Sequence, residues 1–189
     1  MAATVTVRRF TGAQGSSDKW GLPTTKTDVT SVNSRLSSSD SPAPGTDNPI
    51  AIPAAGTNYS YWAHFGLSAD SSPTGTIDNI RWYMDGANSF GHNATMKAVA
   101  AHLYVAATGT EGTTGDQLTL ANHSGIFAGG ASDAFGFTSG SPLALSGSLS
   151  NPDTGCFHDP VAAQIEAPST ATPGELDVDE TGTFKYDET

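Results

Sequence analysis

The chain contains little of what a disulfide-bonded, nucleic-acid-binding or membrane protein needs. Of its 189 residues only Cys156 is a cysteine, so neither an internal disulfide nor a multi-cysteine zinc site can form. Eight basic against 19 acidic residues give a formal charge of -11, which repels nucleic-acid phosphates and anionic lipids. No apolar run approaches the roughly 20 residues that span a bilayer. We therefore expect no nucleic-acid partner and no membrane association.

Large apolar side chains are scarce as well. Leucine, isoleucine, valine and phenylalanine occupy 32 of the 189 positions, which predicts a thin core. Only 14% of the residues are charged, and the aromatic residues lie in short alternating runs, so the chain still has the composition of a folded protein. Its 21 glycines and 11 prolines interrupt it too often for long helices. Two arginines follow the first apolar stretch, the reverse of a secretory signal, so we expect no export signal.

Period-two alternation predicts strands at 4–7, 58–68, 77–84, 161–166 and 182–188. We expect the segments 58–68 and 77–84 to pair as a buried antiparallel hairpin. In the second of them, alternation places Ile80, Trp82 and Met84 on one side and Ile77, Arg81 and Tyr83 on the other. Weaker signals predict a short strand within 28–36 and another in the second half of 95–107, around His102–Val105.

Two long segments lack a clear strand pattern. Residues 37–53 carry four prolines, which remove backbone donors, so this segment is predicted to be an extended arm or a long loop. Residues 108–155 are rich in Gly, Ser and Thr with isolated apolar anchors, so they contain short strands or wrap around a neighbour. Short strands between Gly/Pro turns predict one all-β domain over residues 1–189, an antiparallel β-sandwich or jelly roll with long loops or extended arms.

Catalytic motifs are few. The sequence has no nucleophile elbow, phosphate-binding loop or zinc-protease helix. Its five histidines have no i,i+4 pair, which favours structural or solvated roles. Cys156 lies two residues before His158, but the Asn-Pro-Asp segment before it favours a loop over an activated thiolate. We predict no enzyme activity and no cofactor.

The C-terminal segment partly matches a calcium-binding loop. Its candidate ligands are Asp177, Asp179, Thr181 and Glu188, with Gly182 at the turn position. The flanking helices of such a site are missing from the pattern, and the alternation from Thr183 to Tyr186 favours a strand, so an acidic turn before the last strand is the preferred interpretation and no metal is predicted.

Aromatic side chains offer two further interpretations. They form the core of the paired strands, or some of them are exposed and stack on sugars. Trp20 lies in a polar segment and is predicted to contact a partner, as are three phenylalanines of the Gly/Ser/Thr-rich segment, Phe127, Phe135 and Phe137. The candidates for a sugar-binding platform are Trp20, Trp62, Trp82, Tyr59, Tyr61 and Tyr83.

Two stretches of the sequence carry a resemblance to known proteins. The first comprises 58–62 (NYSYW) and 77–91 (IDNIRWYMDGANSFG), and the second runs from 167–174 (APSTATPG) to 184–188 (FKYDE). Both resemble structural β-sandwich proteins of tailed-bacteriophage virions. Together the two stretches cover about a fifth of the chain and contain no catalytic residue. The resemblance implies a virion protein made in the host cytoplasm.

This resemblance and the composition lead to one expected function. We expect a capsid decoration or minor head protein, present in many copies or as a homo-oligomer, that binds other virion proteins, first among them the major capsid protein. A tail or neck component and a carbohydrate-binding module are the alternatives.

Overall fold

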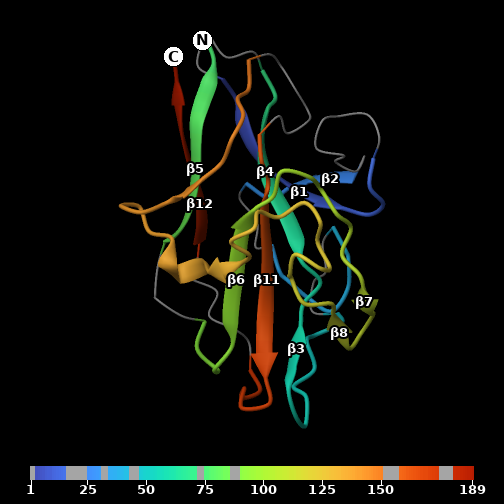
Figure 1. Ribbon diagram of the computed structural model, residues 1–189. Helices are drawn as coiled ribbons and strands as arrows, with labels where there is room; N and C mark the ends of the chain where they lie inside the picture. Colours follow the sequence, from blue (N-terminus) through green and yellow to red (C-terminus); the bar gives the residue numbers. More distant parts are fainter. Residues whose placement is uncertain are drawn as a thin grey trace.

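The computed structural model describes residues 3–15, 25–30, 34–42, 47–71, 75–85, 90–150, 158–174 and 181–189 (Figure 1). Two antiparallel sheets pack against each other, and within these ranges the only helical turn is the 3-10 turn η1 (Ala134–Gly136). The predicted all-β sandwich is therefore confirmed. No helix among these residues is long and apolar enough to cross a membrane.

In the larger sheet, strands that are far apart in the sequence lie side by side. Its order is β2 (Thr25–Asp28), β1 (Val5–Thr11), β4 (Ala63–Ala69), β11 (Val161–Pro168), β6 (Thr95–Ala100) and β9 (Ser132–Asp133), with β3 (Thr57–Tyr59) paired to β11 beside β4. Small side chains line its centre, which allows other layers to approach it closely on both faces; they include Ala63, Ala98, Ala100, Ala162 and Ala163.

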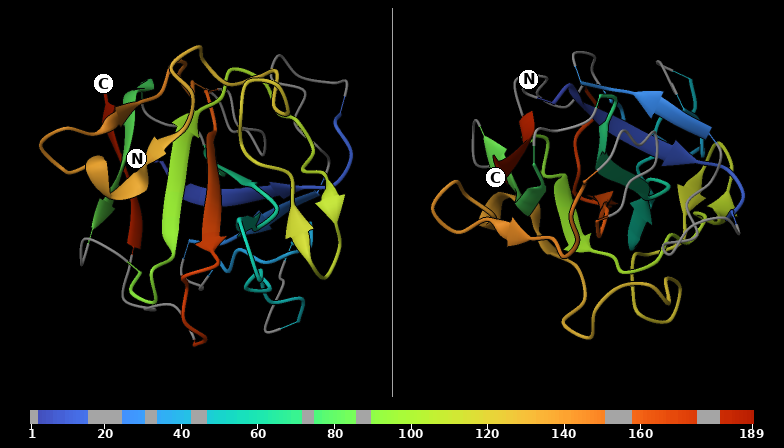
Figure 2. Two further views of the ribbon diagram at one scale, coloured as in Figure 1. Left: turned by 60° about the horizontal axis from the view of Figure 1, so that its bottom comes forward. Right: turned by 90° about the horizontal axis from the view of Figure 1, so that it is seen from above.

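The smaller sheet forms the second layer. Its order is β10 (Leu143–Ala144), β5 (Ile77–Asp85) and β12 (Thr181–Glu188), the last of which confirms the predicted C-terminal strand. Figure 2 shows it beside the larger sheet, with the short ribbon of β7 (Gly109–Thr110) and β8 (Thr114–Gly115) on the far side. Both ends of the chain lie at the same end of the sandwich (Figure 1). There the Ala3 amide donates to Glu188 Oε1 at 3.3 Å.

The core between the sheets contains the residues that alternation predicted on one side of β5, together with one that it did not. Ile80, Trp82 and Met84 are buried as expected, but Ile77 is buried with them. Asn79 adopts a positive φ of 52°, and the register with β12 shifts between Lys185 and Asp187. This bulge inserts one residue, so Ile77 turns to the same side as Ile80. The other large residues of this core are Leu67, Phe90, Met96, Leu145, Leu149, Val161 and Ile165.

A second apolar cluster lies on the opposite, outer face of the larger sheet. Val99 and Ala162 alternate along β6 and β11 with residues of the first core, so they point away from the smaller sheet. Trp62, Leu118 and Ile126 complete this cluster. Part of the 108–155 segment therefore packs on its own domain and contains the short strands β7 to β10, as one of the two predicted alternatives stated.

The predicted hairpin is wrong. Strand β4 pairs with β1 and β11, whereas β5 pairs with β10 and β12 in the other sheet. The chain crosses between the layers after β4, so alternation identified the buried faces but not the hydrogen-bonding partners. The strand predicted over 58–68 is also interrupted, because residues 60–62 separate β3 from β4.

Of the two weaker strand predictions, the one within 95–107 is wrong. The first half of this segment forms β6, and the residues around His102–Val105 form no strand. In 28–36 only Asp28 belongs to a strand among the described residues, as the end of β2, while residues 31–33 lie outside them. The strand content of such short alternating sequences depends on the neighbours available for pairing.

The proline-containing segment forms a long loop, one of the two predicted forms. No strand occurs in its described parts, 37–42 and 47–53. Ser38 donates its amide to Asn48, and the Ser37 and Ser38 carbonyls accept from Tyr61 and Gly112. Leu36 and Ile50 pack against the first core, so these parts of the segment lie on their own domain.

Candidate functional site

The predicted partner-contacting residues occupy different environments. Phe127 is 46% exposed, whereas Phe135 and Phe137 are half-buried against the first core. The Phe135 ring meets Phe90 edge-on at 5.1 Å between centroids, and Phe137 meets Trp82 at 6.3 Å. Trp20 lies outside the described residues. Among the four candidates, only Phe127 is shown with a largely accessible ring.

Phe127 belongs to a loop, residues 119–130, that also carries the exposed Leu120 (Figure 2). Leu120 is 48% exposed, and one other large apolar residue of the described ranges, Ile52, is classed as exposed. The sequence from 117 to 131 contains no charged residue, although the whole chain carries a charge of -11. The 119–130 loop therefore presents two apolar side chains on a locally neutral surface.

Buried anchors attach this loop to the larger sheet. Ile126 forms an isolated β-bridge with Ala101, and the His102 amide donates to the Gly125 carbonyl at 2.8 Å. Within the loop, the His123 amide donates to the Thr119 carbonyl at 2.8 Å. Because several backbone contacts hold it, the loop presents Leu120 and Phe127 from a defined backbone conformation.

Gln164 of β11 fastens the start of the loop. This fully buried side chain donates from Nε2 to the carbonyls of Ser60 and Asp116, both at 2.8 Å, and accepts the Leu118 amide at Oε1 at 2.7 Å. It replaces strand hydrogen bonds at the break between β3 and β4. The sequence analysis missed it, although a glutamine within the apolar run 161–165 was a usable signal.

A pair of buried histidines, one from the larger sheet and one from the loop, joins the two. Nε2 of His64, on β4, is 2.7 Å from Nε2 of His123, and the His123 Nδ1 accepts the Gly125 amide at 3.1 Å. Since the backbone N–H of Gly125 can only donate, the neutral His123 carries its proton on Nε2 and donates it to His64. The His123 ring also packs on Trp62, at 5.5 Å between centroids.

Burial keeps both rings of this pair neutral. It lowers the pKa of His123 to about 4, an effect that His102 reinforces and a backbone hydrogen bond opposes. Burial, with His123 as a second cause, also holds the pKa of His64 well below its ordinary value. The sequence predicted structural or solvated roles for both histidines. Both are buried and hydrogen-bonded within the fold, but their contact across 59 residues was not predictable from spacing.

Polar groups next to the pair are similarly enclosed. The Tyr104 ring lies 4.5 Å from that of His64, its hydroxyl donates to the Gly12 carbonyl at 2.8 Å, and burial raises its pKa. Arg9, 1% exposed, donates from Nη1 to Ser34 Oγ and to the Arg35 carbonyl. Burial lowers the Arg9 pKa to about 10, against the opposing effect of Asp40. These groups support the fold rather than line an open cavity.

His158 is the third buried histidine, and both of its ring nitrogens are hydrogen-bonded. Its Nε2 accepts the Leu67 amide at 2.7 Å, and its Nδ1 donates to the Asp159 carbonyl at 2.8 Å. The His158 side chain thus supplies a hydrogen-bond acceptor to β4 just before β11 begins at Val161. Burial lowers its pKa to about 4.

The sequence also raised an activated thiolate at Cys156 as an alternative. Cys156 lies outside the described residues.

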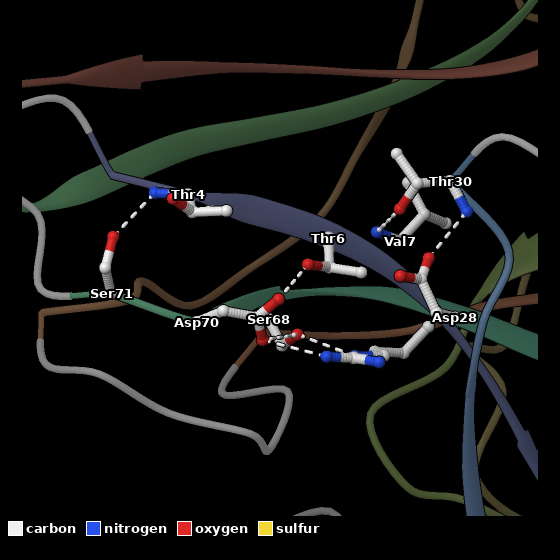
Figure 3. Close-up of polar contacts among 9 residues, drawn as sticks. Thr4, Thr6, Val7, Asp28, Thr30, Ser68, Asp70 and Ser71 are labelled. Atoms are coloured by element: carbon white, nitrogen blue, oxygen red, sulfur yellow. Dashed lines mark hydrogen bonds and ion pairs between the residues drawn. The ribbon is translucent and has the colours of Figure 1, made fainter.

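Figure 3 shows a polar network that fastens β1 to its neighbours. Asp70 accepts hydrogen bonds from Thr6, Arg8 and Ser68, and its ion pair with Arg8 measures 2.8 Å. Burial acts to raise the Asp70 pKa, but these hydrogen bonds outweigh it and the pKa lies below its ordinary value. At the other edge of β1, the Val7 amide donates to Thr30 Oγ1 at 2.9 Å. The Asp70 carboxylate is thus engaged within the fold.

The structure also bears on the calcium pattern. Asp177 and Asp179 lie outside the described residues, while Thr181–Glu188 form β12, as the strand interpretation predicted. In the part of the chain that is described, no group of three or more His, Cys, Asp or Glu side chains could hold a metal ion.

The proposed sugar-binding aromatics are largely internal. Trp62 is 2% and Trp82 3% exposed, and Tyr61 is buried with them. The Trp62 Nε1 donates to the Val105 carbonyl at 2.8 Å, so its polar edge is also occupied. Core packing, the alternative role for these residues, is confirmed for all three.

Comparison with known proteins gave no matching family model, no matching curated protein and no matching solved structure.

Proposed function

We propose that the protein is a structural component of a tailed-phage virion, a capsid decoration or minor head protein that docks on the shell through the 119–130 loop. The observation that carries the proposal is the pair of exposed apolar side chains, Leu120 and Phe127, on a backbone held by buried anchors. Apolar side chains that are enclosed by a partner supply much of the binding energy of a protein interface.

Three further features support a binding role over a catalytic one. The buried histidines use their ring nitrogens for internal contacts, and Asp70 is surrounded by donors from its own sheet. The acidic charge disfavours a nucleic-acid partner, so a protein shell is the better candidate for the docking surface. The resemblance to virion β-sandwich proteins favours a phage particle as the assembly in which the protein docks.

The alternatives differ in what they require of the surface. A tail or neck component would use the same apolar loop at another place in the particle. A carbohydrate-binding module needs accessible aromatic rings, and the burial of Trp62 and Trp82 removes two of its candidates.

Particles of the phage that encodes the chain provide the test. We expect many copies per particle and antibody labelling on the head. The double variant L120A/F127A should be retained at least about tenfold less, because docking would bury the remaining exposed parts of two large side chains. The matched control is I52A, which removes an exposed apolar side chain from a different segment.

Three outcomes would contradict this proposal. Particles with one copy or none exclude a decoration role, and labelling confined to the tail selects the tail or neck alternative. Equal retention of L120A/F127A and I52A removes the 119–130 loop as the docking surface.

A further inference from the structure

The 119–130 loop is attached to the larger sheet by a contact that tolerates only one charge state. Two imidazoles share a single hydrogen bond of 2.7 Å between His64 Nε2 and His123 Nε2. The other nitrogen of His123 is already occupied by the Gly125 amide, itself a donor. Both rings must therefore be neutral for the two hydrogen bonds to exist together.

Proton uptake by either ring breaks one of these bonds. A proton on His64 Nε2 would face the proton that His123 donates, and a proton on His123 Nδ1 would face the Gly125 N–H. Two charged imidazoles at this distance would in addition repel each other in a buried site.

The surroundings offer no compensating carboxylate contact. Ala162 of β11 and the ring of Trp62 contribute apolar surface, and Tyr104 is a neutral phenol hydrogen-bonded to Gly12. In the described ranges no ion pair involves either histidine. The nearby titratable groups are Arg9 on β1, Asp40 in the proline-containing loop and His102 beside the 119–130 loop, of which His102 opposes a charge on His123.

We propose that the His64–His123 pair is an acid-sensitive latch, which holds the 119–130 loop in place at neutral pH and releases it on acidification. The role of that release in detaching the protein from its shell rests on the proposed function. The release itself is local, because β6 and β11 keep their own ladder of backbone hydrogen bonds when the loop leaves the outer face.

Hydrogen exchange on the isolated chain tests the latch without any partner. The amides of His123, Gly125 and Ile126 are bonded within the loop, so their protection factors report its attachment. After correction for intrinsic rates, we expect these factors to fall at least about tenfold between pH 6.5 and 4.5. Global stability also falls with acid, so the amides between β6 and β11 lose some protection, but at each pH they should remain better protected than the loop amides.

Variants assign the effect to the pair. The double variant H64Q/H123Q has no titrating ring at this site, so its loop protection should no longer depend on pH. The matched control H158Q removes a buried histidine elsewhere and should retain the fall. If H64Q/H123Q does not fold, the ring nitrogen signals of His64 and His123 in the unaltered protein should titrate with the same midpoint as the loop amides.

The latch is overturned if loop protection does not change with pH, if H64Q/H123Q shows the same fall as the unaltered protein, or if ring and loop midpoints differ. Equal protection factors in the loop and in β6 and β11 at every pH would also overturn it, since both would then exchange only through global unfolding. Because no shell is present in these measurements, a failure of the latch and a failure of the docking proposal are distinguishable.

Discussion

The two faces of the larger sheet are both buried, but by different kinds of cover. The inner face packs against the smaller sheet with aliphatic and aromatic side chains such as Leu67, Val161 and Trp82. The outer face is covered in part by loops, and there His64 and Gln164 form specific hydrogen bonds among smaller apolar residues. A second sheet satisfies its own backbone groups, whereas a covering loop needs partners for its backbone from the surface beneath it. The outer face therefore contains polar groups whose charge state and geometry matter.

Acid is expected to produce the largest change in the free energy of unfolding, because buried histidines lie on the outer face and at the edge of β4. His123 and His158 have folded pKa values of about 4, and the His64 pKa is also lowered, against an unfolded value of roughly 6.5. The unfolded chain therefore binds more protons below pH 6.5. Stability is fully present above that pH. Between pH 6.5 and 4 it falls by up to about 1.4 kcal/mol per pH unit for each of His123 and His158, and the lowered pKa of His64 adds to the fall. Urea titrations at several pH values measure the slope.

Single substitutions divide that slope between the sites. H123Q and H158Q should each lower the pH slope of the free energy of unfolding by up to about 1.4 kcal/mol per pH unit, which corresponds to one proton. A slope that is unchanged in H158Q would show that this ring is not buried in its neutral form.

The next largest effect is expected when a large side chain of the core between the two sheets is truncated. We expect W82A to lower the free energy of unfolding by about 3–5 kcal/mol, because a large cavity would form between the sheets. Thermal and urea unfolding followed by circular dichroism measure the loss. A loss below about 1 kcal/mol would mean that the two sheets do not depend on this packing.

Replacement of Gln164 should destabilise the outer face by a smaller amount. Q164M keeps a similar length but leaves the carbonyls of Ser60 and Asp116 and the Leu118 amide without this partner, at a cost of about 2–4 kcal/mol. The neighbouring inner-face variant I165M conserves volume and should cost less than about 1.5 kcal/mol. Equal losses for the two variants in urea unfolding would remove the distinction between the faces.

The smallest effect is expected at the loop surface. F127A should change the free energy of unfolding by less than about 0.5 kcal/mol, because the ring is already 46% exposed. Unfolding curves of F127A and the unaltered protein should nearly coincide. A loss above about 1 kcal/mol would indicate that Phe127 is part of the core, and its assignment as a docking residue would then fail.

Sequence alternation identified most of the long strands but not their partners. The pattern in β5 placed Ile80, Trp82 and Met84 in the core, yet it missed the bulge at Asn79 that brings Ile77 to the same side. It also paired β4 with β5, because neighbouring strands in sequence are the simplest hairpin, whereas the chain crosses between layers at this point. Local sequence does not specify which distant strand completes a ladder.

The candidate site was only partly accessible to the same reasoning. Phe127 was selected because it is an aromatic residue in a polar segment, and it is exposed. Leu120, the other exposed residue of the loop, was noted only as an apolar anchor of the segment. The contacts of His64 with His123 and of Gln164 with Leu118 join positions 59 and 46 residues apart, so no motif of fixed spacing could reveal them.

Composition and periodicity by themselves determined the all-β class, the thin core and the acidic character of the chain, since each depends only on which residues are present and how they alternate. Tertiary structure alone decided which strands pair, which face each loop covers and which histidines meet. Those outcomes depend on satisfying buried polar groups across long stretches of sequence, and only the assembled sheets bring the required donors and acceptors together.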